Sequence, residues 1–135
     1  MAAGYGVPLV RRAGGWIPGQ TAATDSDQAI AVAPFDGTVT KVSILPEAAV
    51  TGATATKRTF TLVNKGQAGS GTTVVATLDL VTGTNLAAFD EMLFTLSADP
   101  ANKVAQGDVL ALVETHASTG TAHSGGEIEV EFTRA

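Results

Sequence analysis

The chain has 135 residues, 44% of them hydrophobic, a length and composition typical of one folded domain and not of a disordered chain. Its net charge is −5 and its eight Lys and Arg residues are scattered, so we expect no nucleic-acid partner, because phosphate binding needs clustered cations. The absence of cysteine excludes disulfides and thiolate metal sites, and with no long apolar run or charged leader we expect neither a membrane partner nor a signal peptide.

Residues 1–26 show neither the period of a strand nor that of a helix. The stretch GYGVPLVRRAGGWIPGQ (4–20) holds the only Tyr, the only Trp and the only Arg-Arg pair, but Gly and Pro interrupt it every few residues. We therefore predict no regular helix or strand there.

Tyr, Trp and Arg are the side chains that concentrate binding energy at interfaces, and proline reduces the entropy lost when an extended segment is held in place. We predict that residues 1–26 form an extended N-terminal arm that lies along another molecule, in preference to a disordered tail. An intramolecular strand that covers an edge of the chain's own fold is the remaining alternative. The predicted partner contacts are Tyr5, Val7, Leu9, Arg11, Arg12, Trp16 and Ile17.

From residue 27 onward, period-2 alternation predicts strands. QAIAVAPF (28–35) places Ile30 and Val32 on one face, and Asp36-Gly37 predicts a hairpin turn into GTVTKVSIL (37–45). RTFTLVN (58–64) directs Phe60 and Leu62 to the same side. These segments predict three strands in the first half of the domain.

The second half continues this pattern. KGQAGSGTT (65–73) predicts a hairpin loop, and VVATLDLV (74–81) places Val74 on the face of the next three alternating apolar residues. Residues 84–89 alone have helical potential, as a single turn that Thr84 or Asn85 would cap. LFTLS (93–97), VLALVETH (109–116) and EIEVEFT (127–133) predict the remaining strands, of which 109–116 is the central one because both its faces begin apolar.

Short strands separated by Gly- and Thr-rich turns, with no helical repeat, predict an all-β fold. We expect one β-sandwich over residues 27–135, of jelly-roll or immunoglobulin-like topology.

The chain carries no recognisable catalytic motif: GxSxG, P-loop and HExxH patterns are all missing. The nearest approach to a zinc site is Glu114, His116 and His123, but a site needs a supporting shell, and we interpret the two histidines as exposed loop-end residues. We therefore predict that the protein is not an enzyme and has no catalytic residue, metal ligand or cofactor.

Two groups of carboxylates suggest no site either. Glu127, Glu129 and Glu131 would project from one strand face about 7 Å apart, which is typical of a solvated face that discourages edge-to-edge aggregation. The acidic residues of the loops lack the D-x-D-x-D spacing of a calcium loop. They are Asp90, Asp99 and Asp108.

Residues 30–133 resemble small capsid decoration (cement) proteins of tailed bacteriophages, especially those of actinobacterial hosts. The resemblance rests on the composition and the order along the chain of four features: DGTVT (36–40), NKGQAG (64–69) with GTT (71–73), GDVL (107–110) and the closing alternating strand. It implies a structural virion protein, made in the host cytoplasm, that binds the major capsid protein on the outer capsid surface and braces the shell. It leaves open whether the protein self-associates as a trimer.

The alternative function is a carbohydrate-binding or host-adhesion β-sandwich displayed on the particle. Such sites present aromatic platforms, whereas the loops 65–73 and 117–126 contain no aromatic residue. The sequence therefore favours the decoration role.

Overall fold

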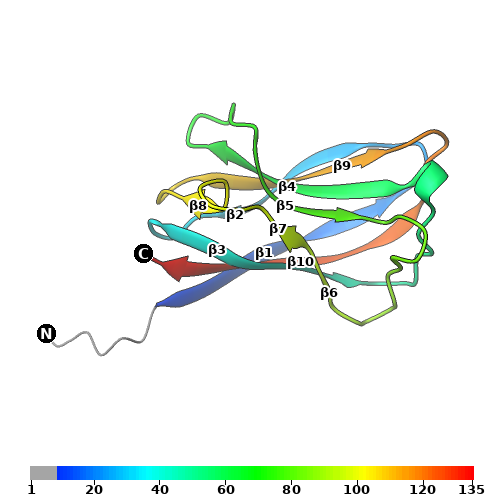
Figure 1. Cartoon of the computed structure of the whole chain (residues 1–135), viewed down its shortest axis with the longest axis horizontal. Helices are drawn as coiled ribbons and strands as arrows, with labels where there is room; N and C mark the ends of the chain where they lie inside the picture. The colour runs from blue at the N-terminus through cyan, green and yellow to red at the C-terminus, as the bar shows by residue number, and fades with distance from the viewer. Residues whose placement is uncertain (1–8) are drawn as a thin grey trace, which may run out of the picture.

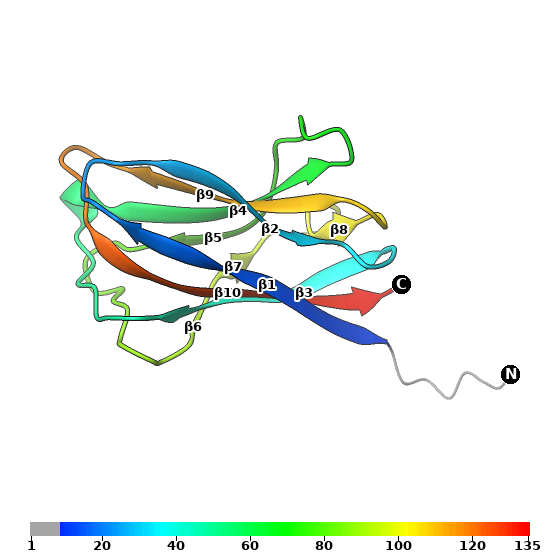
Figure 2. The ribbon, with the colours of Figure 1, turned by 180° about the vertical axis from the view of Figure 1, so that it is seen from behind.

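The computed structural model describes residues 9–135, so the predicted contacts Tyr5 and Val7 lie outside the described residues. The described chain is all-β, with two antiparallel sheets that face each other (Figures 1 and 2). The elements are β1 (Val10–Gln20), β2 (Ser26–Val32), β3 (Gly37–Pro46), the 3-10 turn η1 (Thr54–Thr56), β4 (Arg58–Gly66), β5 (Thr73–Asp79), β6 (Met92–Leu93), β7 (Thr95–Leu96), β8 (Lys103–Val104), β9 (Val109–His116) and β10 (His123–Arg134).

Sheet A has the order β1-β10-β3-β6, with β8 also paired to β3, and sheet B has the order β2-β9-β4-β5-β7. The hydrophobic core lies between them and is built from the inward positions that alternation predicts. Phe60 and Leu62 of β4 are fully buried, as are all three apolar residues of the closing strand. The closing strand supplies Ile128, Val130 and Phe132. The all-β prediction is confirmed.

Two further predictions about strands are confirmed. β9 lies between β2 and β4, and its apolar start is covered, with Leu110, Ala111 and Leu112 all buried. β4 and β5 pair as an antiparallel hairpin around the loop that follows Gly66.

Three local predictions are wrong. Asp36-Gly37 is no hairpin turn, because β2 belongs to sheet B and β3 to sheet A, so the turn carries the chain from one sheet to the other. Val74 does not face the core: a register shift where β5 meets β4 turns Val75 inward and leaves Val74 40% exposed. Residues 84–89 form no helix, because the Asn85 Oδ1 atom accepts the Gly52 N–H (2.8 Å) from another loop and does not cap a turn.

The prediction that residues 10–20 lack regular structure is also wrong. β1 pairs with β10 along almost its whole length, and Ile17 is fully buried in the core. Gly14 permits this approach, since a Cβ there would lie 1.9 Å from the Ile128 carbonyl oxygen. Pro18 is tolerated because β1 is an edge strand, where a missing N–H breaks no ladder. The described part of the predicted arm is therefore the alternative, a strand that covers an edge of the chain's own fold.

Candidate functional site: two surfaces made by strand β1

Strand β1 has one free edge. The Leu9 carbonyl faces β10, where it accepts the Arg134 N–H (2.9 Å), so by alternation the even-numbered residues direct their backbone groups away from β10. The Trp16 carbonyl confirms this, because it accepts a hydrogen bond from the Gln28 Nε2 atom of β2 (2.7 Å). The side chain of Gln28 thus connects the edges of the two sheets at the middle of β1.

Alternation distributes the predicted contact residues over three environments. Ile17 faces the core and is fully buried, so it is no partner contact. Leu9 and Arg11 face the space between the sheet edges, and Arg12 and Trp16 face the outer side of sheet A. The Arg-Arg pair is therefore divided: the Arg11 side chain faces the space between the sheet edges, whereas the Arg12 guanidinium lies beside Glu129 and Glu131 on the outer side of sheet A.

The first surface is a groove of about 420 Å³ at the start of β1. Near Gly15 the edges of the two sheets approach closely, since a Cβ there would lie 3.6 Å from the Ile30 carbonyl oxygen. Toward Leu9 the two edges diverge, as Figure 2 shows, and the groove opens between them. We call this surface the seam groove; it is lined by Leu9, Arg11, Arg12, Ala13, Val32, Pro34, Phe35, Gln106 and Arg134.

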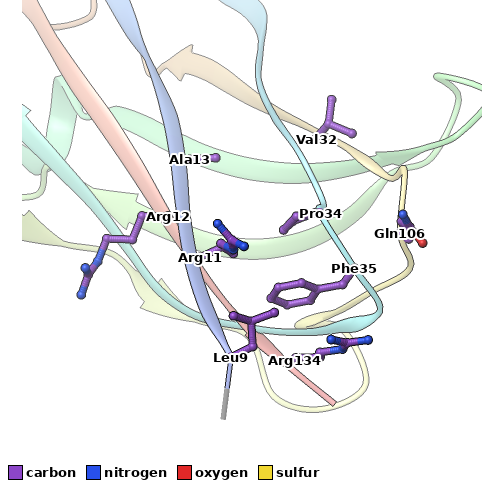
Figure 3. A pocket seen from close by; sticks show the side chains of 9 residues that line it. All are labelled: Leu9, Arg11, Arg12, Ala13, Val32, Pro34, Phe35, Gln106 and Arg134. Carbon is purple, nitrogen blue, oxygen red and sulfur yellow. The ribbon is translucent and has the colours of Figure 1, made fainter. Parts of the chain in front are cut away.

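The seam groove combines apolar walls with positive charge (Figure 3). Phe35 is partly buried against the core, and Val32, predicted to share the buried face of Ile30, is instead 56% exposed in the groove. In Figure 3 the Phe35 ring lies between the Arg11 and Arg134 side chains, whereas Arg12 points away on the far side of β1.

The two arginines at the start of β1 differ in their partners. Arg12 is neutralised within the chain, with its Nη2 atom 3.0 Å from Glu131 and its Nε atom 3.6 Å from Glu129. Four lysines also form ion pairs with carboxylates. Arg11 and Arg134 form none with any residue in the described range, and both are exposed in the seam groove.

The second surface is the outer side of sheet A. Trp16 pairs with Glu127, which pairs with Leu45, so the three side chains form one row across β1, β10 and β3. Trp16 is 49% exposed and Leu45 44% exposed. Leu93 of β6, also exposed, lies in register with Ser43 of β3, two residues along the strand from Leu45. We call this row, with Leu93, the outer row.

The acidic residues beside the outer row belong to the same solvated face, as predicted. Glu127 is exposed, whereas Glu129 and Glu131 are partly buried and lie beside Arg12. Glu91 accepts a hydrogen bond from the Ser43 hydroxyl (2.7 Å), which together with the ammonium of Lys41 lowers the pKa of its carboxyl below the usual 4.5.

The expected exposure of both histidines is wrong for His123. Its side chain is buried against that of Glu114, and the Ser26 hydroxyl donates to the other Glu114 oxygen (2.8 Å). Gly125 N–H donates to His123 Nδ1 (3.0 Å), so the ring proton is on Nε2 and is donated to Glu114.

His116 lies apart from this pair and contacts Asp25 (2.6 Å). Ser26 bonds to Glu114 and not to a histidine, so these residues do not form a nucleophile beside a base. Within residues 9–135 no three His, Cys, Asp or Glu side chains gather in a way that could hold a metal ion.

Two of the three loop carboxylates, those of Asp108 and Asp99, contact other residues of the chain. Asp108 accepts hydrogen bonds from the Ala105 N–H (2.9 Å) and the Asn64 amide (2.9 Å). Burial alone would raise the pKa of Asp108, but these hydrogen bonds outweigh it and lower the pKa below the usual 3.8. Asp99 lies beside Lys103 (3.9 Å).

Among the contributors to the seam groove that sequence reasoning missed are Val32, Phe35 and Arg134. They come from the end of β2, the turn after it and the end of β10. No spacing in the sequence indicates that these segments meet, because the meeting depends on which strands pair. Once β1 is known to pair with β10, Arg134 follows from the register, since Val10 lies opposite Thr133.

Comparison with known proteins adds no relative: no protein-family model matches the chain, and no curated protein matches it. Within the described residues no helix is long and apolar enough to cross a membrane.

Proposed function

We propose that the protein is a capsid decoration protein: a structural virion component that binds the outer surface of an assembled phage shell, with the major capsid protein as its partner. The role needs no catalysis and no cofactor. Bound in many copies, each protein would favour the assembled shell over its separate subunits, because a ligand that binds only one state stabilises that state by mass action.

The strand pairing supports a jelly roll over an immunoglobulin-like sandwich. The pairs are nested: β1 with β10, β2 with β9, β3 with β8, and β4 with β5. Two facing sheets connected in this way are typical of jelly rolls, an architecture found in viral capsid proteins and in lectins. We infer that topology here.

The observation that carries the proposal is the exposure of Trp16 on a strand that is otherwise part of the body. Trp16 is the only Trp of the chain, and it is half-exposed in the same row as the exposed Leu45, with Glu127 between them. Large aromatic residues held on a rigid strand make strong binding anchors because little side-chain entropy is lost on binding. The outer row is therefore the proposed shell contact, with Tyr5 and Val7 of the segment before β1 as additional contacts.

Deleting residues 1–20 cannot test this proposal, because it would remove β1 together with the buried Ile17. The sharper test is to add the protein back to particles assembled without it. Trp16→Ser should weaken binding about tenfold or more, the size of effect expected for an interface anchor. Removal of residues 2–8 should weaken it further through the loss of Tyr5 and Val7.

Val74→Ser is the matched control, since Val74 is similarly exposed but lies on β5 of the other sheet. Quantitative mass spectrometry would count bound copies per particle, and the temperature of DNA release would report shell stability. Wild-type protein that does not bind, or Trp16→Ser that binds as well as wild type, contradicts the proposal.

A further inference from the structure

The seam groove is positively charged in an acidic protein. Of the eight Lys and Arg residues, five pair with carboxylates and Arg58 is buried against backbone carbonyls. The two that remain within residues 9–135, Arg11 and Arg134, both line this groove. The chain has net charge −5, yet none of the described residues that line the groove is acidic. Guanidinium groups bind carboxylates with paired, charge-assisted hydrogen bonds, so the chemistry of the groove suits an acidic ligand.

The groove also has the backbone geometry to hold an extended segment. It is bordered by the free edge of β1, where the backbone groups of Val10 and Arg12 face away from β10. An extended chain laid along that edge would hydrogen-bond to β1 as an added strand. Facing the groove, Leu9, Arg11 and Ala13 form an apolar, cationic, apolar series at every second position.

We propose that the seam groove binds an extended segment of the partner protein that carries a carboxylate between two apolar side chains, alternating along one face. The carboxylate pairs with Arg11, with Arg134 beyond the Phe35 ring adding to the positive field, and the flanking side chains pack against Leu9 and Ala13. The identification of that partner as a shell protein rests on the proposed function, whereas the chemistry of the groove does not.

Charge excludes the nearest competing occupant. Residues 1–8 of the chain, MAAGYGVP, contain no Asp or Glu and cannot neutralise the two arginines. A second copy of the chain does carry acidic residues, so the test must distinguish self-association from binding of a different segment.

The test uses the full chain labelled with ¹⁵N and the capped pentapeptide Val-Ser-Glu-Ser-Val, whose symmetric pattern presents the same face in either strand direction. We expect saturable amide shifts at 9–13, 32, 33, 35 and 134. Arg11→Gln combined with Arg134→Gln should weaken binding about tenfold, as expected when a charge-assisted pair is lost. Lys103→Gln, at an exposed lysine outside the groove, should leave it unchanged.

Arg11→Glu combined with Arg134→Glu should reverse the preference, so that Val-Ser-Lys-Ser-Val binds and the Glu peptide does not. Equal binding of the Lys and Glu peptides by wild type, or equal shifts with acetate alone, would overturn the proposal. So would shifts at 9–13 that depend only on protein concentration, which would identify a second copy as the occupant. If the peptides do not bind but the protein still binds particles, the groove proposal fails and the decoration role is unaffected. If the Glu peptide binds but the protein does not bind particles, the decoration role fails and the groove proposal is unaffected.

Discussion

At the scale of single residues, the end of the fold opposite the seam groove is held by Arg58. This guanidinium is fully buried, and it donates to four backbone carbonyls: Thr24 O (2.6 Å), Thr21 O (3.0 Å), Thr121 O (3.0 Å) and Ala22 O (3.2 Å). It thereby ties the turn between β1 and β2 to the loop before β10. The buried charge of Arg58 is tolerated because its N–H groups donate hydrogen bonds to backbone carbonyl oxygens.

Arg58→Met should therefore lower the free energy of unfolding by about 3 kcal/mol, because several carbonyls lose their donor at once. Urea denaturation followed by the fluorescence of the single Trp would measure it. Arg134→Met, at an exposed arginine, should change stability by less than about 0.5 kcal/mol. Equal losses in the two variants would show that the Arg58 hydrogen bonds carry little of the stability.

Two carboxyls with lowered pKa values, Glu91 and Asp108, predict a loss of stability in acid. A group whose folded pKa is depressed contributes stability above its unfolded pKa, and that contribution disappears as the pH falls through the folded pKa. The wild-type melting temperature should therefore fall as the pH is lowered past the usual carboxyl values of 4.5 and 3.8. Glu91→Gln combined with Asp108→Asn should show a shallower fall between neutral and acidic pH, and an unchanged slope would refute this origin.

At the scale of elements, β1 shows why the sequence predicted some strands and not others. The core-facing half of β10 follows from alternation alone, because Ile128, Val130 and Phe132 mark one face without interruption. β9 follows instead from a segment that begins apolar on both faces. The glycines and the single proline of β1 obscure its alternation, although they are compatible with its place at the sheet edge. Gly14 gives β10 room to approach, and Pro18 lies on the free edge.

The other errors of prediction arose because β-bulges and strand pairing cannot be read from the local sequence pattern. Val74 was assigned to the wrong face because one extra residue in β5 shifts the register, which no local pattern indicates. The candidate site was predicted in its residue types, Trp16 and the two adjacent arginines, but not in its division between two surfaces. That division requires knowing that the segment is a strand.

Two neighbouring glycines in β1 give a matched test of this packing. In Gly14→Ala the added Cβ would meet the Ile128 carbonyl oxygen at 1.9 Å, so β1 must separate from β10, and we expect a loss of about 2 kcal/mol or more. In Gly15→Ala the nearest atom is 3.6 Å away, an ordinary contact, so stability should hold or rise slightly. Urea denaturation would compare them, and similar losses in both would contradict the observed register.

At the scale of the whole molecule, the two surfaces of β1 suit a protein that must fold before it binds. The strand is anchored by β10 and Ile17, so its outer row and the seam groove are presented in fixed positions, and no large ordering cost is left for the binding step. On the proposed shell, one strand would thus contact a partner through the Trp16 face and through the Arg11 groove.

Oxidative footprinting of the protein, free and bound to particles, tests that central claim most directly. Mass spectrometry would follow modification of Trp16 and of the peptide 9–13, with Val74 as the internal reference on sheet B. The account predicts that Trp16 and residues 9–13 are modified readily in the free protein and strongly protected on the particle, whereas Val74 changes little. Equal modification of Trp16 in both states, or a Trp16 already protected in the free protein, would contradict it.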